Sequence, residues 1–275
     1  MTTPEAGYNM MIKAMHQVIR NVPYKSIGGR NLHLDLHLPD ESIRRRGVVV
    51  YFHGGGLEVG ARGDYEDTRA SVLAAMGYTV ATVEYRFIQE ALLPAALEDG
   101  RDAVAWLKLN AKNEYGVDAS TIGAWGASAG GYLAALLALG NPLAGRMPAV
   151  DAAAVWFASF DLAAMDAASP MEEEVMGPSA VEGLLGEKFD RSNELHLSLN
   201  PVSMISADAS AMLLVTGDRD RVIEPSQSVR MHDALVQAGV TSSLYIAGGA
   251  GHEDPVFDRP TFIAVVKAFF DEHLA

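Results

Sequence analysis

Hydrophobic residues are spaced differently in two parts of the chain. Residues 32–38 alternate strictly, with leucine at every second position, and this pattern predicts a strand that is buried on one face. The later apolar runs are continuous, which is typical of strands buried on both faces of a largely parallel sheet. These runs are Val48–Phe52, Tyr78–Val83, Thr121–Trp125, Ala152–Ala158, Met212–Thr216 and Ser243–Ala247.

Helical patterns separate these runs. Residues 94–110 place leucines and a valine along one side, and residues 225–239 begin at a proline and end at a glycine, as helices often do. Further helices are expected over about 5–20, 64–76, 128–139 and 259–273. Strands that alternate with helices predict a single α/β domain over residues 1–275, with helices on both faces of its sheet.

One stretch, residues 161–200, breaks this alternation. It has no strand pattern, and it contains three consecutive glutamates, Glu172–Glu174. Ligands of α/β proteins bind beyond the carboxyl ends of the strands. We therefore expect residues 161–200 to form a short cap insertion that stands over a binding site.

The composition excludes several classes of function. Acidic residues number 35 and lysines plus arginines 21, and the resulting net charge of −14 disfavours nucleic acid as a partner. There is no cysteine, so thiolate nucleophiles and cysteine-ligated zinc are ruled out. The N-terminus lacks a signal-peptide pattern, and no apolar run approaches the roughly 20 residues of a membrane helix. We expect a soluble, cytoplasmic protein with no membrane span, and the oligomeric state is left open, a homodimer included.

A serine lies among small residues at a predicted strand-to-helix turn. It is Ser128, in the sequence Gly126-Ala-Ser-Ala-Gly-Gly131. A strand that turns sharply into a helix forces the central residue to a positive φ, and the neighbouring residues must be small for the turn to close. The hydroxyl is then presented at the tip of the turn, which favours Ser128 as a nucleophile.

Three further features stand at the ends of other predicted strands. The glycines Gly54–Gly56 follow the first continuous apolar run, and their N–H groups can point into a pocket, as an oxyanion requires. Asp220 and His252 each follow a later run. A serine nucleophile requires a base, and the base requires an orienting acid; the chain order serine, acid, histidine is that of α/β-hydrolases. Asp218 is a competing candidate for the acid.

Six motifs occur together in this chain. They are His53-Gly-Gly-Gly56, Tyr85-Arg86, Pro94-Ala-Ala-Leu-Glu-Asp99, Gly126-Ala-Ser-Ala-Gly-Gly131, Asn200-Pro-Val-Ser203 and Gly217-Asp-Arg-Asp220. Over residues 22–273, the chain resembles the α/β-hydrolase esterases of the hormone-sensitive-lipase type, and within them the BD-FAE-like branch. The resemblance implies the α/β-hydrolase fold, with an eight-stranded, mostly parallel sheet flanked by helices.

The resemblance also implies a serine carboxylesterase that needs neither a cofactor nor a metal. Its substrates are expected to be short-chain or small-alcohol carboxylic esters, cleaved through an acyl-enzyme. The roles that it assigns by motif are nucleophile for Ser128, base for His252, acid for Asp220, and oxyanion N–H donors for Gly54, Gly55 and Ala129.

Other functions on the same fold stay open at this point: an aryl formamidase, a lactonase, a peptidase, or a ligand receptor without activity. Formamidases often carry tryptophan where this chain has Leu57, and receptors tend to lose a member of the triad. Leu57 and Glu58 are candidate substrate-binding residues. A carboxylate at Glu58 selects a polar or cationic substrate unless it pairs with Arg62, and we expect the pairing.

Overall fold

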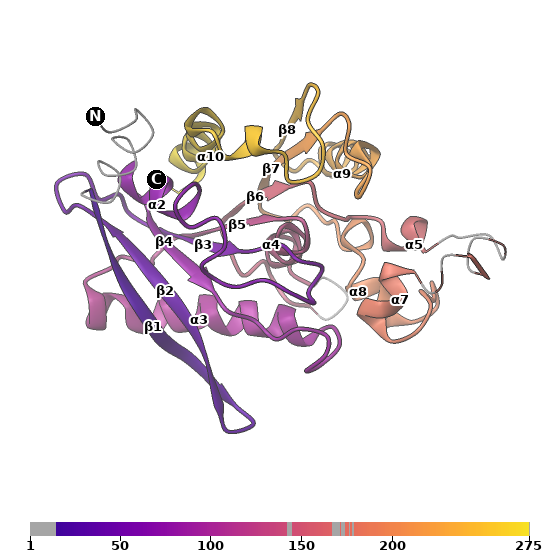
Figure 1. The fold of residues 1–275 in the computed structure, drawn as a ribbon, viewed down its shortest axis with the longest axis horizontal. Helices are drawn as coiled ribbons and strands as arrows, with labels where there is room; N and C mark the ends of the chain where they lie inside the picture. The colour runs from indigo at the N-terminus through magenta and orange to yellow at the C-terminus, as the bar shows by residue number, and fades with distance from the viewer. Residues whose placement is uncertain are drawn as a thin grey trace.

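The computed structural model describes residues 15–141, 145–166, 171, 174, 175, 177 and 179–274. Eight strands form one sheet in the order β1-β2-β4-β3-β5-β6-β7-β8 (Figure 1). β1 and β2 run antiparallel to their neighbours, and the other pairs are parallel. The strands are β1 His16–Ile27, β2 Arg30–Pro39, β3 Val48–Phe52, β4 Thr79–Val83, β5 Ile122–Ala127, β6 Ala152–Trp156, β7 Ala211–Gly217 and β8 Ser242–Ala247.

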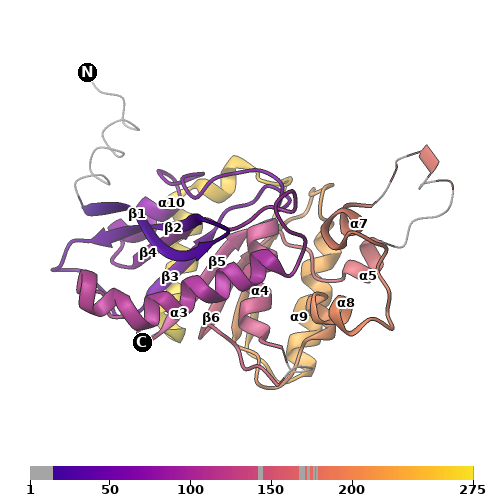
Figure 2. The same cartoon turned by 90° about the horizontal axis from the view of Figure 1, so that it is seen from below.

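Helices cover both faces of the sheet (Figure 2). One face packs against α3, α4 and α9 and the other against α2 and α10, in two separate apolar clusters. The helical elements are α2 Ala70–Ala75, α3 Ala95–Tyr115, α4 Ala129–Leu139, α5 Leu162–Met165, α7 Ala180–Leu185, α8 Glu194–Ser198, η2 Pro201–Ser203, α9 Pro225–Gln237, η3 Pro255–Asp258 and α10 Pro260–His273. The cap helices α5, α7 and α8 gather at one end of the molecule in both views.

The continuous apolar runs form the central strands. Every residue of β3, β4, β5 and β6 is buried. In β3, Val48 and Val50 belong to one apolar cluster, and Val49 and Tyr51 belong to the other. A strand covered by helices on both sides buries all its side chains, which explains the lack of alternation in its sequence. The predicted eight-stranded, mostly parallel sheet is confirmed.

The N-terminal region differs from its prediction. Most of the helix expected over 5–20 lies outside the described residues, but its last part, from His16, belongs to β1. β1 pairs with β2 in a hairpin that turns at two glycines of positive φ, and this pairing outweighs the local helical pattern. β2 is therefore an inner strand rather than a half-exposed one, and its polar residues Asp35 and His37 are buried too.

The helix predicted over 64–76 forms only at Ala70–Ala75. The residues before it make successive turns, and Tyr65 has a φ of 57°, which an α-helix excludes. The turns carry this segment along the cavity described below.

A buried carboxylate joins the outer strands to the helices. Asp99 of α3 is fully buried and accepts hydrogen bonds from the side chains of Arg86 and Lys25, at 2.8 and 2.6 Å. Burial alone raises the pKa of Asp99, but the hydrogen bonds from the two cations outweigh it, and the pKa lies below its ordinary value of 3.8. Two motifs of the sequence, Tyr85-Arg86 and the segment ending at Asp99, therefore brace the fold.

We expect Asp99→Ala to lower the free energy of unfolding by about 3–5 kcal/mol, because it leaves the largely buried Arg86 without its carboxylate and Lys25 with only the half-exposed Asp102. Asp102→Ala is the matched control: Asp102 pairs with the same Lys25 at 2.6 Å, but its side chain is 49% exposed. The control should lose less than about 1 kcal/mol. Urea denaturation measures both, and equal losses would contradict the assignment.

From the lowered pKa of Asp99 we also predict how the stability of the fold changes in acid. The pKa of Asp99 is lowered in the folded state. The ionised carboxylate therefore makes its full contribution to the free energy of unfolding at any pH above the ordinary pKa of 3.8. The contribution is lost as the pH falls through the lowered value. The difference in stability between wild type and Asp99→Ala should therefore shrink in acid.

Candidate active site

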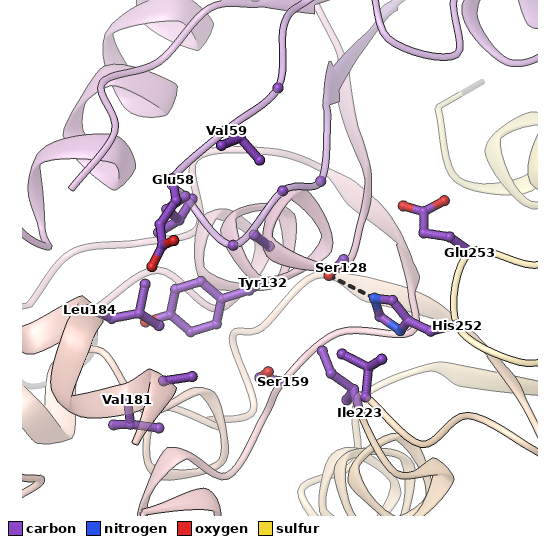
Figure 3. A pocket seen from close by; sticks show the side chains of 18 of the residues that line it. Glu58, Val59, Ser128, Tyr132, Ser159, Val181, Leu184, Ile223, His252 and Glu253 are labelled. Carbon is purple, nitrogen blue, oxygen red and sulfur yellow. Dashed lines mark hydrogen bonds between the residues drawn. The ribbon is translucent and has the colours of Figure 1, made fainter. Parts of the chain in front are cut away.

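Residues that follow five strands line one cavity of about 570 Å³. The five strands end at the edge of the sheet where the carboxyl ends of parallel strands meet. The residues are Gly54 after β3, Ser128 after β5, Ser159 after β6, Ile223 after β7 and His252 after β8. Figure 3 shows the side chains of Ser128, Ser159, Ile223 and His252 converging on the cavity, with Val181 and Leu184 of α7 on its other side.

Ser128 lies at the turn between β5 and α4, with a φ of 53°. This left-handed conformation is rare for a residue with a side chain, and it persists where the surrounding packing enforces it. A Cβ atom at Gly126 would lie 2.2 Å from the carbonyl oxygen of Gly130, and one at Gly130 would lie 2.0 Å from that of Phe52. Only glycine fits at these two positions. The turn therefore has the sharp strand–turn–helix geometry that the sequence predicts.

A chain of hydrogen bonds runs from Ser128 through His252 to Asp220. The Nε2 atom of His252 lies 3.0 Å from Oγ of Ser128, and Nδ1 lies 2.7 Å from Oδ2 of Asp220. The other oxygen of the buried Asp220 accepts the N–H groups of Val222 and Ile223, both at 2.9 Å. The carboxylate is thus fixed so that it can hold a proton on Nδ1 and leave Nε2 facing the hydroxyl.

The competing acid, Asp218, has a different partner. Its Oδ1 accepts the N–H group of Gly249 at 2.6 Å, so the side chain joins the loops that follow β7 and β8. The structure therefore brings Asp220, rather than Asp218, to His252.

Backbone N–H groups from two elements surround the serine. Ala129 is the first residue of α4, where helical N–H groups have no partner within the helix. A Cβ atom at Gly54 would lie 3.4 Å from Cβ of Ser128. The glycine loop, Gly54–Gly56, therefore lies directly against the nucleophile candidate. Among the described residues, no protein group accepts the N–H of Gly54 or Gly55. Such free donors can stabilise a negatively charged oxygen.

A buried arginine holds one wall of the cavity. Arg69 is fully buried and donates to Glu253 and Asp258, both at 2.6 Å. It also donates to the hydroxyl of Tyr51 at 3.0 Å, and burial raises the pKa of that hydroxyl to about 12. Glu253 directly follows the histidine, and its free oxygen would lie 3.1 Å from a Cβ atom at Gly54. The arginine thereby ties the loop that carries His252 to Tyr51 of β3, the strand that leads into Gly54–Gly56.

Leu57 and Glu58 both line the cavity, Leu57 buried and Glu58 exposed. The expected pairing of Glu58 with Arg62 is wrong. Arg62 pairs instead with Asp35 at 2.9 Å and Glu84 at 3.2 Å. A buried carboxylate such as Asp35 needs a counter-charge, whereas an exposed one such as Glu58 is solvated by water. Arg62 therefore pairs with Asp35 of β2 rather than with Glu58.

The remaining walls are mainly apolar. They are formed by Leu162 and Met165 of α5, Val181 and Leu184 of α7, and Tyr132 of α4. The hydroxyl of Tyr132 donates to the carbonyl of Leu199 at 2.6 Å, which leaves its ring to face the cavity (Figure 3). Apart from the general expectation that the cap stands over the site, the sequence assigns no role to Leu162, Val181, Leu184 or Tyr132.

No metal centre is evident in the parts of the chain that the structure describes. No group of three or more histidine, aspartate and glutamate side chains there is arranged to hold an ion. Nor do the described helices include one that is long and apolar enough to cross a membrane.

Comparison with known proteins identifies a family. The family model BD-FAE matches residues 34–235, well over half of the chain. Esterase LipQ of Mycobacterium tuberculosis is 26% identical over 82% of this chain, and the probable carboxylic ester hydrolase LipM of the same organism is 28% identical over 79%. The matches cover 54% and 52% of these relatives, so the chain spans about half the length of the curated proteins that it matches.

Solved structures share the fold. A truncated carbohydrate esterase from gut microbiota superposes with a TM-score of 0.79 at 23% identity, covering 94% of this chain and 96% of that one. The propionate-bound esterase Est2 of Thermogutta terrifontis superposes with a TM-score of 0.74 at 21% identity, covering 95% of each chain. These likenesses establish the α/β-hydrolase fold that the sequence motifs imply.

We expect Arg69→Met to lower the free energy of unfolding by about 3–5 kcal/mol, because it leaves Glu253 and Asp258 as unpaired, largely buried charges. Arg45→Met is the matched control. Arg45 also pairs with an aspartate, Asp271, at 2.9 Å and lies over a tyrosine ring, but its side chain is 41% exposed. Its loss should stay below about 1 kcal/mol. Urea denaturation of both variants checks this, and a loss at Arg69 no larger than the control's would refute it.

Proposed function

The chain belongs to the BD-FAE family, and from this membership we propose that the protein is a serine carboxylesterase. The observation that carries the proposal is the hydrogen-bond chain Ser128–His252–Asp220, with distances of 3.0 and 2.7 Å. Two curated relatives named as an esterase and a probable carboxylic ester hydrolase support it. Its substrates, in this proposal, are short-chain carboxylic esters or esters of small alcohols.

The reaction proceeds in two acyl transfers. Oγ of Ser128 attacks the ester carbonyl while Nε2 of His252 takes the hydroxyl proton. The tetrahedral intermediate collapses, the carbon–oxygen bond to the alcohol breaks, and the alcohol leaves with the proton from His252. Water then attacks the acyl-enzyme in the same way and releases the acid. Asp220 keeps the imidazole in the required tautomer throughout.

The N–H groups of Gly54, Gly55 and Ala129 act on the negative charge that forms on the carbonyl oxygen. Charge develops there only in the transition state, so donors that are already in place stabilise it without reorganisation. The tight fit of Gly55, whose Cβ atom would lie 2.1 Å from the carbonyl oxygen of Val59, supports a rigid donor set.

Ser128→Ala should abolish the hydrolysis of p-nitrophenyl butyrate, with a loss in kcat on the order of 10⁶, because the variant lacks the hydroxyl that forms the acyl-enzyme. A fluorophosphonate should add its mass to the wild type and not to the variant. Ser159→Ala is the control, since Ser159 lines the same cavity and should leave the labelling intact. Labelling of Ser128→Ala, with activity retained, would overturn the assignment of the nucleophile.

Asp220→Asn should lower kcat by about 10⁴, because the asparagine amide favours the wrong tautomer of His252. Asp218→Asn removes a loop hydrogen bond instead and should cost far less. Steady-state kinetics of the two variants separate the candidates. If Asp218→Asn is the more damaging, the two aspartates have been assigned in reverse.

The efficiency kcat/KM should peak with acetyl to butyryl esters and fall beyond about six carbons. Each buried methylene contributes only about 0.8 kcal/mol, and a longer chain would reach either solvent or the carboxylate of Glu58. Hydrolysis of p-nitrophenyl acetate, butyrate, octanoate and decanoate at subsaturating concentration tests this. A rise through octanoate is the contradictory result.

A further inference from the structure

The charged side chains that line the catalytic cavity are all acidic. Of the described lining residues, Glu58, Asp64 and Glu253 carry carboxylates, and none is lysine or arginine. Asp64 accepts the N–H group of Ala61 at 2.8 Å, and Glu253 pairs with Arg69 at 2.6 Å. These two carboxylates are therefore engaged by the protein itself.

Glu58 differs from the other two. Its carboxylate has no hydrogen-bond or ion-pair partner among the residues that the structure describes. The nearest cation in the sequence, Arg62, is engaged by Asp35 and Glu84. Figure 3 shows the Glu58 side chain pointing into the cavity from the side opposite His252. An unpaired negative charge thus faces whatever part of a substrate lies farthest from the ester bond.

The apolar walls of the cavity narrow the choice of substrate. They include Val181, Leu184 and Tyr132, which offer apolar surface and almost no hydrogen-bonding groups. A sugar would leave hydroxyls against this surface without partners, at a cost in binding. An alkylammonium group instead places methylenes against the walls and its positive charge beside the carboxylate.

We propose that this enzyme selects esters that carry a cationic group at the end remote from the scissile bond, and that Glu58 is the residue that selects them. The inference rests on the proposed esterase function and specifies its substrate class. Attraction between a cation and an unpaired carboxylate favours such esters over neutral and anionic ones of the same shape. Since Glu58 is exposed, salt should weaken the preference.

Two pairs of isosteric esters test the proposal, each differing only in a nitrogen cation against a carbon. Butyrylthiocholine is compared with 3,3-dimethylbutyl thiobutyrate, and p-nitrophenyl 4-(trimethylammonio)butanoate with p-nitrophenyl 5,5-dimethylhexanoate. The chain contains no cysteine, so a thiol reagent reports only the thiol product of the first pair. The readout is the ratio of kcat/KM within a pair, from which any general change in activity cancels.

We expect a ratio of about three- to fivefold in favour of the cation in one pair or both, equivalent to about 0.7–0.9 kcal/mol, which is the range of an exposed ion pair. The ratio should fall towards one in 1 M NaCl and in Glu58→Gln. Glu41→Gln is the control: Glu41 is exposed and outside the cavity, and its removal changes the net charge equally, so the ratio should stay constant.

Two results would overturn the inference while leaving the esterase function standing. One is hydrolysis of both members of each pair at similar efficiency. The other is a cation preference that Glu58→Gln leaves unchanged. Absence of turnover with every ester, together with no fluorophosphonate labelling of Ser128, would instead overturn the proposed function and the inference with it.

Discussion

The contact between the turn at Ser128 and the end of β3 is the constraint on which the whole site depends. Because Gly126 and Gly130 have no side chains, α4 can start directly against the carbonyl of Phe52. This arrangement brings three groups close together: the hydroxyl of Ser128, the first N–H group of α4 and the glycine loop. The left-handed backbone at Ser128 costs on the order of 1–3 kcal/mol, which the buried helix and sheet around it must offset.

Much of this arrangement could be predicted from the sequence, because it is encoded locally. Buried parallel strands are short apolar runs, and a sharp turn requires small residues at fixed positions. Ser128, Asp220 and His252 each follow such a run, and a parallel sheet brings the ends of its strands together. Their meeting therefore followed from topology, and the distances in the structure agree with it.

The features that could not be predicted are mainly ion pairs between residues that are far apart in the sequence. Nothing near Arg62 indicates that Asp35 and Glu84 will capture it, and nothing near Arg69 points to Glu253. The last part of the helix expected over 5–20, from His16, belongs to β1 for a related reason, since pairing with β2 outweighs local preference. Long-range ion pairs and strand pairings leave no periodic signal, so these features became visible only in three dimensions.

The buried arginine also has a consequence for the order in which the molecule is made. Arg69 leaves the ribosome long before Glu253 and Asp258, since chains emerge from their N-terminus. Until those carboxylates arrive, the guanidinium lacks the counter-ions that its burial requires. The wall of the cavity beside the histidine is therefore completed only after the strands of the sheet that supports it have emerged.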